Sequence, residues 1–129
     1  MQIRFASITV EDQDKALRFY TEILGFAKAA DRSMGAYRFL TVTSPEGVAG
    51  AELVLEPPGF PPAQIYQKAK FDAGIPAAAF VTSDIAAEYR RLADKGVRFR
   101  GEPQNLGPIT AALFEDGCGN LINLVQPTA

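Results

Sequence analysis

The sequence predicts an α+β protein made of two βαβββ modules in tandem, with curved mixed sheets that form a concave cleft. The same order of one strand, one helix and three strands fits the chain twice. Gly25 and Gly96 each follow a helical segment and lie 71 positions apart, and the strand-like segments 53–57 (LVLEP) and 123–127 (NLVQP) match at an offset of 70. A constant shift of about seventy residues indicates an internal duplication.

The first module is expected to occupy residues 1–57. Residues 2–10 alternate apolar and polar side chains, which is typical of a strand. Asp12 is placed to cap a helix that runs to Leu24, where Gly25 ends it. Ala16, Phe19, Tyr20, Ile23 and Leu24 form the apolar stripe of this helix. Three strands are then expected at residues 26–30, 37–43 and 51–57, with turns at 32–35 and 44–50.

Residues 58–74 are expected to link the two modules. Four prolines and two glycines fall between positions 57 and 74, so we predict no regular structure there. The aromatic residues of this segment, Phe60, Tyr66 and Phe71, would form a stiff flap beside a binding site or pack against a partner. The whole chain of 129 residues is expected to be one domain.

The second module is expected to occupy residues 75–129. Residues 75–82 have the composition of a strand, and Ser83 or Asp84 is placed to cap a helix that runs to Lys95 and ends at Gly96. Three strands are then expected, at residues 97–101, 109–115 and 120–127.

Composition limits the possible functions. The chain has no histidine and one cysteine, so the usual zinc and iron(II) sites and histidine-based catalytic triads cannot be built. A net charge of −2 and dispersed basic residues argue against a nucleic-acid surface. We find neither a signal peptide nor a membrane-length apolar run, and a lone cysteine fits a reducing compartment, so we expect a cytoplasmic protein.

Several segments carry a resemblance to a known family. The segments ITVEDQDKALRFYTEILGF, VTSDIAAEYRRLADKGVRF and DGCGNLINLVQP resemble the vicinal oxygen chelate superfamily, which includes glyoxalase, bleomycin-resistance proteins and extradiol dioxygenases. The resemblance covers nearly the whole chain and implies the tandem βαβββ fold. It also implies a homodimer, since family members usually pair their modules across an interface. Function does not follow from the fold alone.

The metal enzymes of this superfamily take their ligands from the first and last strands of each module. The corresponding positions here are Phe5, Leu53, Ala77 and Asn123, and none is a histidine or a carboxylate. A slip of one or two residues would bring Ser7 or Glu52 near the site without creating a histidine. The resemblance therefore implies neither glyoxalase I nor extradiol dioxygenase activity, and we expect no metal and no cofactor.

If these four positions face the cleft, strand alternation places Ser7 and Thr9 there as well. Further residues on the same face would be Ala51, Leu55, Ala79 and Leu121. The cleft would then be mostly apolar with a few polar anchors, which is the usual composition of a small-molecule site. Alternatively, Phe5 and Leu53 fill the cleft as ordinary core residues.

Charged residues offer further candidates. Arg38 could bind a carboxylate, although a surface arginine on a strand is the more common case. Glu52 and Glu56 are candidates for a catalytic base. Tyr66 could stack on a ligand, whereas Cys118 lies in the expected hairpin turn DGCGN and shows no sign of being a nucleophile.

These observations favour a metal-independent protein that binds a small, apolar or aromatic molecule, as a protein that sequesters a drug or metabolite would. One alternative is a metal-free lyase or isomerase that uses a cleft carboxylate. Another is an interaction module with a filled cleft. We expect no nucleic-acid or membrane partner.

Overall fold

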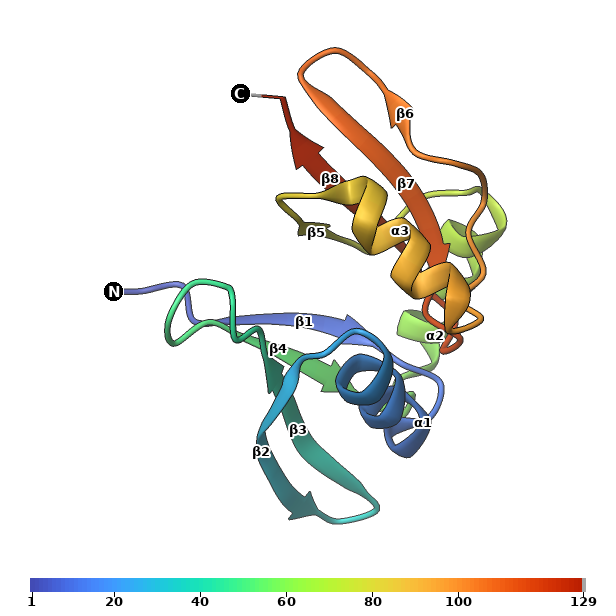
Figure 1. Ribbon diagram of the computed structural model, residues 1–129. Helices are drawn as coiled ribbons and strands as arrows, with labels where there is room; N and C mark the ends of the chain where they lie inside the picture. The colour runs from blue at the N-terminus through green and yellow to red at the C-terminus, as the bar shows by residue number, and fades with distance from the viewer. Residues whose placement is uncertain (129) are drawn as a thin grey trace. The chain divides into compact units, whose positions relative to one another are not determined.

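The structure is a computed structural model that describes residues 1–128 (Figure 1). The chain divides into two compact units, Met1–Gln67 and Lys68–Ala129. Each unit contains a four-stranded mixed sheet with a helix after its first strand. The predicted α+β fold with two tandem βαβββ modules is therefore confirmed. Within residues 1–128, no helix has the length and apolar character needed to cross a membrane.

The sheet of the first unit has the strand order β1-β4-β3-β2. Strand β1 runs parallel to β4, and the other neighbours are antiparallel. The strands are β1 (Phe5–Thr9), β2 (Ala27–Met34), β3 (Tyr37–Thr43) and β4 (Glu52–Glu56).

Helix α1 (Gln13–Arg18) covers one face of this sheet and continues as a π-helix, η1 (Phe19–Ile23) (Figure 1). The Asp12 side chain accepts a hydrogen bond from the Lys15 amide at 3.0 Å, so the predicted cap is confirmed. Gly25, with φ of 89°, ends the helical run in a conformation that costs glycine little. Side chains from the helical run and from the strands form the core of the unit, which contains Ile8, Val10, Ala16, Tyr20, Leu40, Val42 and Leu55.

Strand β2 is longer than predicted. It extends to Met34, where a turn at Gly35 and Ala36 joins it to β3, and Met34 pairs with Tyr37. The predicted turn starting at Arg32 does not form, although the residues at its start are polar. They belong to the edge strand of the sheet, where polar side chains remain in solvent.

The linker is not irregular, because helix α2 (Pro61–Asp72) occupies most of it. Pro61 and Pro62 lie in the first turn, where a missing N–H breaks no intrahelical hydrogen bond. The Phe60 carbonyl accepts the Ala63 amide at 2.9 Å and so begins the helix. After Pro62, no proline or glycine follows until Gly74, so the residues expected to break a helix lie only at or beyond its ends.

The sheet of the second unit has the order β5-β8-β7-β6, again with its first and last strands parallel. Its elements are β5 (Ala78–Val81), α3 (Ile85–Asp94), β6 (Gln104–Asn105), β7 (Ile109–Glu115) and β8 (Leu121–Pro127). The Asp84 side chain caps α3 by accepting the Ala87 amide at 3.1 Å. The core of the unit contains Ile85, Leu92, Ala112, Phe114, Ile122 and Leu124.

The strand predicted at residues 97–101 does not form. The Arg100 amide donates to the Leu113 carbonyl at 2.8 Å, and Phe99 forms a single bridge to Phe114. Gly101, with φ of 151°, interrupts the extended chain, and pairing with β7 resumes only at Gln104. The segment thus lies beside β7 without becoming a regular strand.

Candidate ligand-binding site

One face of the first sheet packs against α1, and the opposite face carries a pocket. Parallel partners in β1 and β4 point to the same side of the sheet, and the register pairs Phe5 with Glu52 and Ser7 with Val54. Ser7 and Phe5 therefore share this open face with alternate residues of β4, including Glu56. Leu53 and Leu55 point to the opposite face, where Leu55 is fully buried.

The expected facing of Leu53 and Leu55 is thus corrected by one residue. The offset of 70 between the two final strands equates Leu53 with Asn123, but Leu53 pairs with Ala6 on the helix side of its sheet, whereas Asn123 lines the pocket on the open face of the second sheet. Leu53, Val54 and Leu55 are all apolar, so alternation in the sequence could not decide which of them faces the cleft. Shifting β4 by one residue relative to the predicted alignment brings Glu52 to the open face, and this is the register observed.

The pocket on the open face has a volume of about 500 Å³. The rings of Phe5 and Phe39 meet edge to face with centroids 6.0 Å apart, and Tyr37 extends the same wall. A Cβ on Gly59 would lie 3.0 Å from Cε2 of Tyr37, so a glycine lets the chain after β4 pass close to this ring. The pocket is lined by Phe5, Ser7, Met34, Tyr37, Arg38, Phe39, Val54, Glu56 and Pro57.

The two carboxylates of β4 differ in their surroundings. Glu52 Oε1 accepts a hydrogen bond from the Thr41 hydroxyl at 2.6 Å, and Thr41 Oγ1 accepts the Ala30 amide at 3.0 Å where a bulge interrupts β2. Glu56 lines the pocket, and within residues 1–128 its carboxylate makes no hydrogen bond or ion pair. These two glutamates lie four residues apart along the strand and do not form an acid–base pair.

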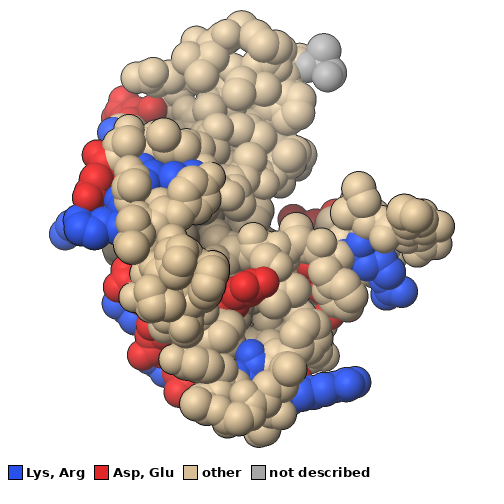
Figure 2. Space-filling model, turned by 180° about the vertical axis from the view of Figure 1, so that it is seen from behind, with Lys and Arg blue, Asp and Glu red and all other residues tan. Residues whose placement is uncertain are grey.

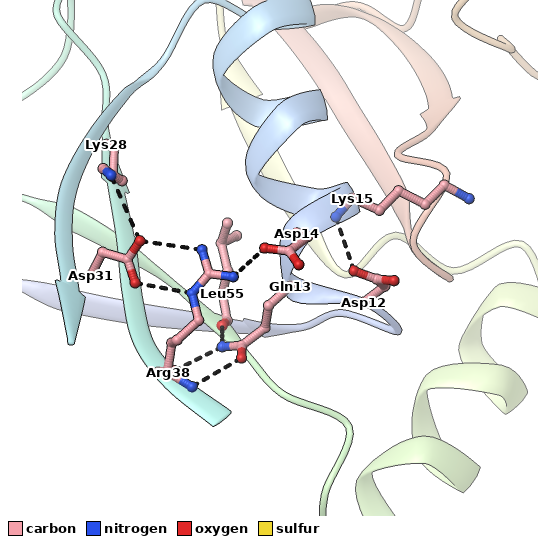
Figure 3. Close-up of polar contacts among 8 residues, drawn as sticks. All are labelled: Asp12, Gln13, Asp14, Lys15, Lys28, Asp31, Arg38 and Leu55. Carbon is pink, nitrogen blue, oxygen red and sulfur yellow. Dashed lines mark hydrogen bonds and ion pairs between the residues drawn. The ribbon is translucent and has the colours of Figure 1, made fainter. Parts of the chain in front are cut away.

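Arg38 borders the pocket, but its guanidinium is directed toward acidic residues (Figure 3). Its Nε and Nη2 donate to the two oxygens of Asp31 at 2.9 and 3.2 Å, and Nη1 forms an ion pair with Asp14. Hydrogen bonding from Arg38 lowers the pKa of Asp31, and the same contact raises the pKa of Arg38. These contacts occupy the Arg38 guanidinium, which the sequence suggested as a binding group for a ligand carboxylate.

Gln13 fixes the strands behind the pocket to helix α1 (Figure 3). Its Nε2 donates to the Leu55 carbonyl at 3.0 Å and to the Arg38 carbonyl at 2.8 Å, and its Oε1 accepts the Arg38 amide at 3.1 Å. Gln13 is only 8% exposed. This residue was not singled out from the sequence, where a glutamine in the first turn of a helix is expected to face solvent.

A smaller pocket of about 310 Å³ lies in the second unit, on the sheet face opposite α3. Asn123 and Leu113 are paired neighbours in its floor. Arg100 lies at its edge, with Nε donating to Glu115 at 3.0 Å and the guanidinium carbon 5.1 Å from the centre of the Phe71 ring. Its remaining lining is mixed, with Pro76, Gly101, Glu102, Gln104, Leu106, Ala111 and Ala112.

The other predicted site residues lie outside these two pockets. The Ala77 amide donates to the Leu121 carbonyl at 2.8 Å, and the Thr9 carbonyl accepts a hydrogen bond from Gln67 Nε2 at 2.7 Å. Tyr66 lies on α2 and is exposed. Five residues that line the first pocket were not predicted as site residues: Met34, Tyr37, Phe39, Val54 and Pro57. Strand alternation, which places Tyr37 and Phe39 on one face, was the signal that could have found those two.

The residues do not fit the metal site of the related enzymes. Phe5 and Ala77 offer no donor atoms, and Glu52 is the single carboxylate at the corresponding positions. Across residues 1–128, no group of three or more Asp, Glu, Cys or His side chains is arranged to hold a metal ion.

Comparison with known proteins identifies the family. Residues 2–124 match the Glyoxalase/Bleomycin resistance protein/Dioxygenase superfamily, and the chain belongs to it. It is similar to the uncharacterized protein YurT of Bacillus subtilis (strain 168), with 52% identity over 126 residues that cover 98% of this chain and 99% of YurT.

Two solved structures are also similar. UcmS2 is 32% identical, with a TM-score of 0.83 and 97% of each chain covered. TnmS3, an antibiotic binding protein from Streptomyces sp. CB03234, is 32% identical, with a TM-score of 0.79, 99% of this chain covered and 97% of TnmS3. The superfamily likeness thus includes a protein whose described role is to bind an antibiotic.

Proposed function

We propose that this protein binds a planar aromatic small molecule without a metal ion and holds it unchanged. The pocket of about 500 Å³ carries the proposal, because its size lies within the usual range for ligand sites and its walls are aromatic. Phe5 and Tyr37 are 54% and 42% exposed, so their rings are available to a ligand. The likeness to an antibiotic binding protein supports the same reading.

Metal independence is part of the proposal. Its support is the donor set, since the positions that correspond to ligands in the related enzymes carry Phe5, Ala77 and Asn123, with Glu52 in place of Leu53 on the open face. One carboxylate does not supply the three or four protein ligands that catalytic metal sites use.

A metal-free enzyme is the second candidate, because Glu56 places a carboxylate at the pocket wall. A lone carboxylate of this kind could serve as a general base if a substrate presented an acidic C–H or O–H to it. Recovery of the ligand in unchanged form after incubation supports sequestration, and a new product on chromatography supports the enzyme.

We further propose that the protein is a homodimer. Family members usually pair their modules between two chains, and exposed apolar residues on the open faces, such as Met34 and Val81, would be covered by such pairing. Sedimentation equilibrium would report a dimer mass. We also propose a cytoplasmic location, in keeping with the single cysteine of the sequence.

The test of the binding site uses acridone, a neutral, flat, fluorescent tricycle. We expect saturable binding to the native chain, weakened about tenfold or more in Tyr37→Ala and Phe39→Ala, because each removes aromatic contact area. Val48→Ala serves as the control, since Val48 is an exposed apolar residue in a turn outside the pocket. Equal affinity in all four proteins would place the ligand elsewhere, and no binding of any aromatic probe would overturn the proposal.

A further inference from the structure

We propose that the aromatic pocket of the first unit selects ligands that carry a positive charge, with Glu56 as the counter-charge. This inference rests on the proposed binding function and names the chemical class of its ligand: a planar aromatic amine in its protonated form, or a quaternary aromatic cation. It follows from three properties of the pocket, which are the free carboxylate, the neutralised arginine and the exposed ring faces.

Glu56 is the free carboxylate of the pocket. Its main chain is held in place, because its carbonyl accepts the Val10 amide at 2.9 Å and the residue pairs with Thr9. Its side chain points to the pocket face and, within the described residues, has no partner that would compete with a ligand. Glu52, on the same face of the strand, is different because Thr41 already donates to it.

Arg38 does not cancel this charge. It is the one basic residue among those that line the pocket, and its guanidinium is paired with Asp14 and Asp31. Asp31 also meets Lys28 Nζ at 3.6 Å, so two cations and two carboxylates balance one another on the helix side of the strand. Glu56 therefore leaves the pocket with an uncompensated negative charge.

The aromatic walls add an attraction of the same sign. The faces of Phe5, Phe39 and Tyr37 carry the negative part of the ring quadrupole, which attracts a cation placed over them. Carboxylate and rings together distinguish a cation from a neutral molecule of the same shape. A purely apolar pocket would instead discriminate against the charged ligand because of its desolvation cost.

The test compares three tricyclic probes of nearly the same shape: 9-aminoacridine, which is a cation at neutral pH, neutral acridone, and anionic acridine-9-carboxylate. We expect the cation to bind about tenfold more tightly than acridone at low salt, and the anion to bind most weakly. Added salt should reduce the preference, since the carboxylate is exposed. Glu56→Gln should bring the affinities for the cation and for acridone to within about twofold of each other, because it removes the negative charge and keeps nearly the same side-chain shape.

Glu46→Gln is the matched control, because Glu46 is an exposed glutamate in the turn before β4 and does not line the pocket. It should keep the full preference for the cation. If acridone binds and Tyr37→Ala weakens it, but the cation shows no preference or keeps it in Glu56→Gln, the charge inference fails and the proposed function stands. If none of the three probes binds, both fail.

Discussion

Replacing Gln13 with leucine should destabilise the fold, although Gln13 itself does not line the pocket. The change removes three hydrogen bonds and leaves the buried Leu55 carbonyl without the donor that Gln13 supplies. A typical hydrogen bond contributes about 1 kcal/mol, and an unsatisfied buried group costs about 1–3 kcal/mol. We therefore expect a loss of about 2–4 kcal/mol in the free energy of unfolding, a large share of the roughly 5–15 kcal/mol typical of a domain.

Urea denaturation followed by circular dichroism measures this loss. Gln2→Leu is the control, because Gln2 is exposed and precedes β1, and it should change stability by less than about 0.5 kcal/mol. Gln13→Glu should also destabilise, since a carboxylate cannot donate to the Arg38 and Leu55 carbonyls. A loss in Gln13→Leu no greater than in Gln2→Leu would refute the role of this residue in joining α1 to β3 and β4.

Three further predictions concern charge, pocket shape and the cysteine. Because Arg38 lowers the pKa of Asp31, the native chain should be more stable than Asp31→Asn at pH 7. This advantage should fade as the pH falls below 3.8, the ordinary pKa of the aspartate side chain, and denaturation across that pH range would measure it. Gly59→Ala should displace the Tyr37 ring and weaken acridone binding several-fold with little effect on the melting temperature, and unchanged affinity would contradict this. Cys118 is fully buried, so Ellman's reagent should react slowly with the native chain and quickly in urea, and fast native labelling would count against this burial.

The fold was predictable because its main signals are local and occur twice. Asp12 and Asp84 cap the two helices, and Gly25 and Gly96 end them in the left-handed region, as their sequence positions indicated. Alternation defined most of the strands. The linker helix was missed because prolines were treated as helix breakers wherever they occur, although a first turn tolerates them.

The pocket was predictable only in part. Strand alternation correctly placed Phe5 and Ser7 on the open face of β1. In β4, three consecutive apolar residues gave no alternation to follow, so Leu53 was predicted on the open face in place of Glu52 and Val54. The pairing of Arg38 with Asp14 and Asp31 joins residues distant in the sequence, which no local pattern reveals. Exact register between strands far apart in the chain is a tertiary property.

The most direct measurement is a calorimetric titration of acridone into the metal-stripped protein, repeated with excess EDTA and then with added Mg²⁺, Mn²⁺, Zn²⁺ or Fe²⁺. If the aromatic pocket binds its ligand without a metal, all of these dissociation constants should agree within about twofold. Loss of binding in EDTA, with recovery on adding one of the metals, would contradict metal-independent binding and would direct attention to Glu52 as a ligand.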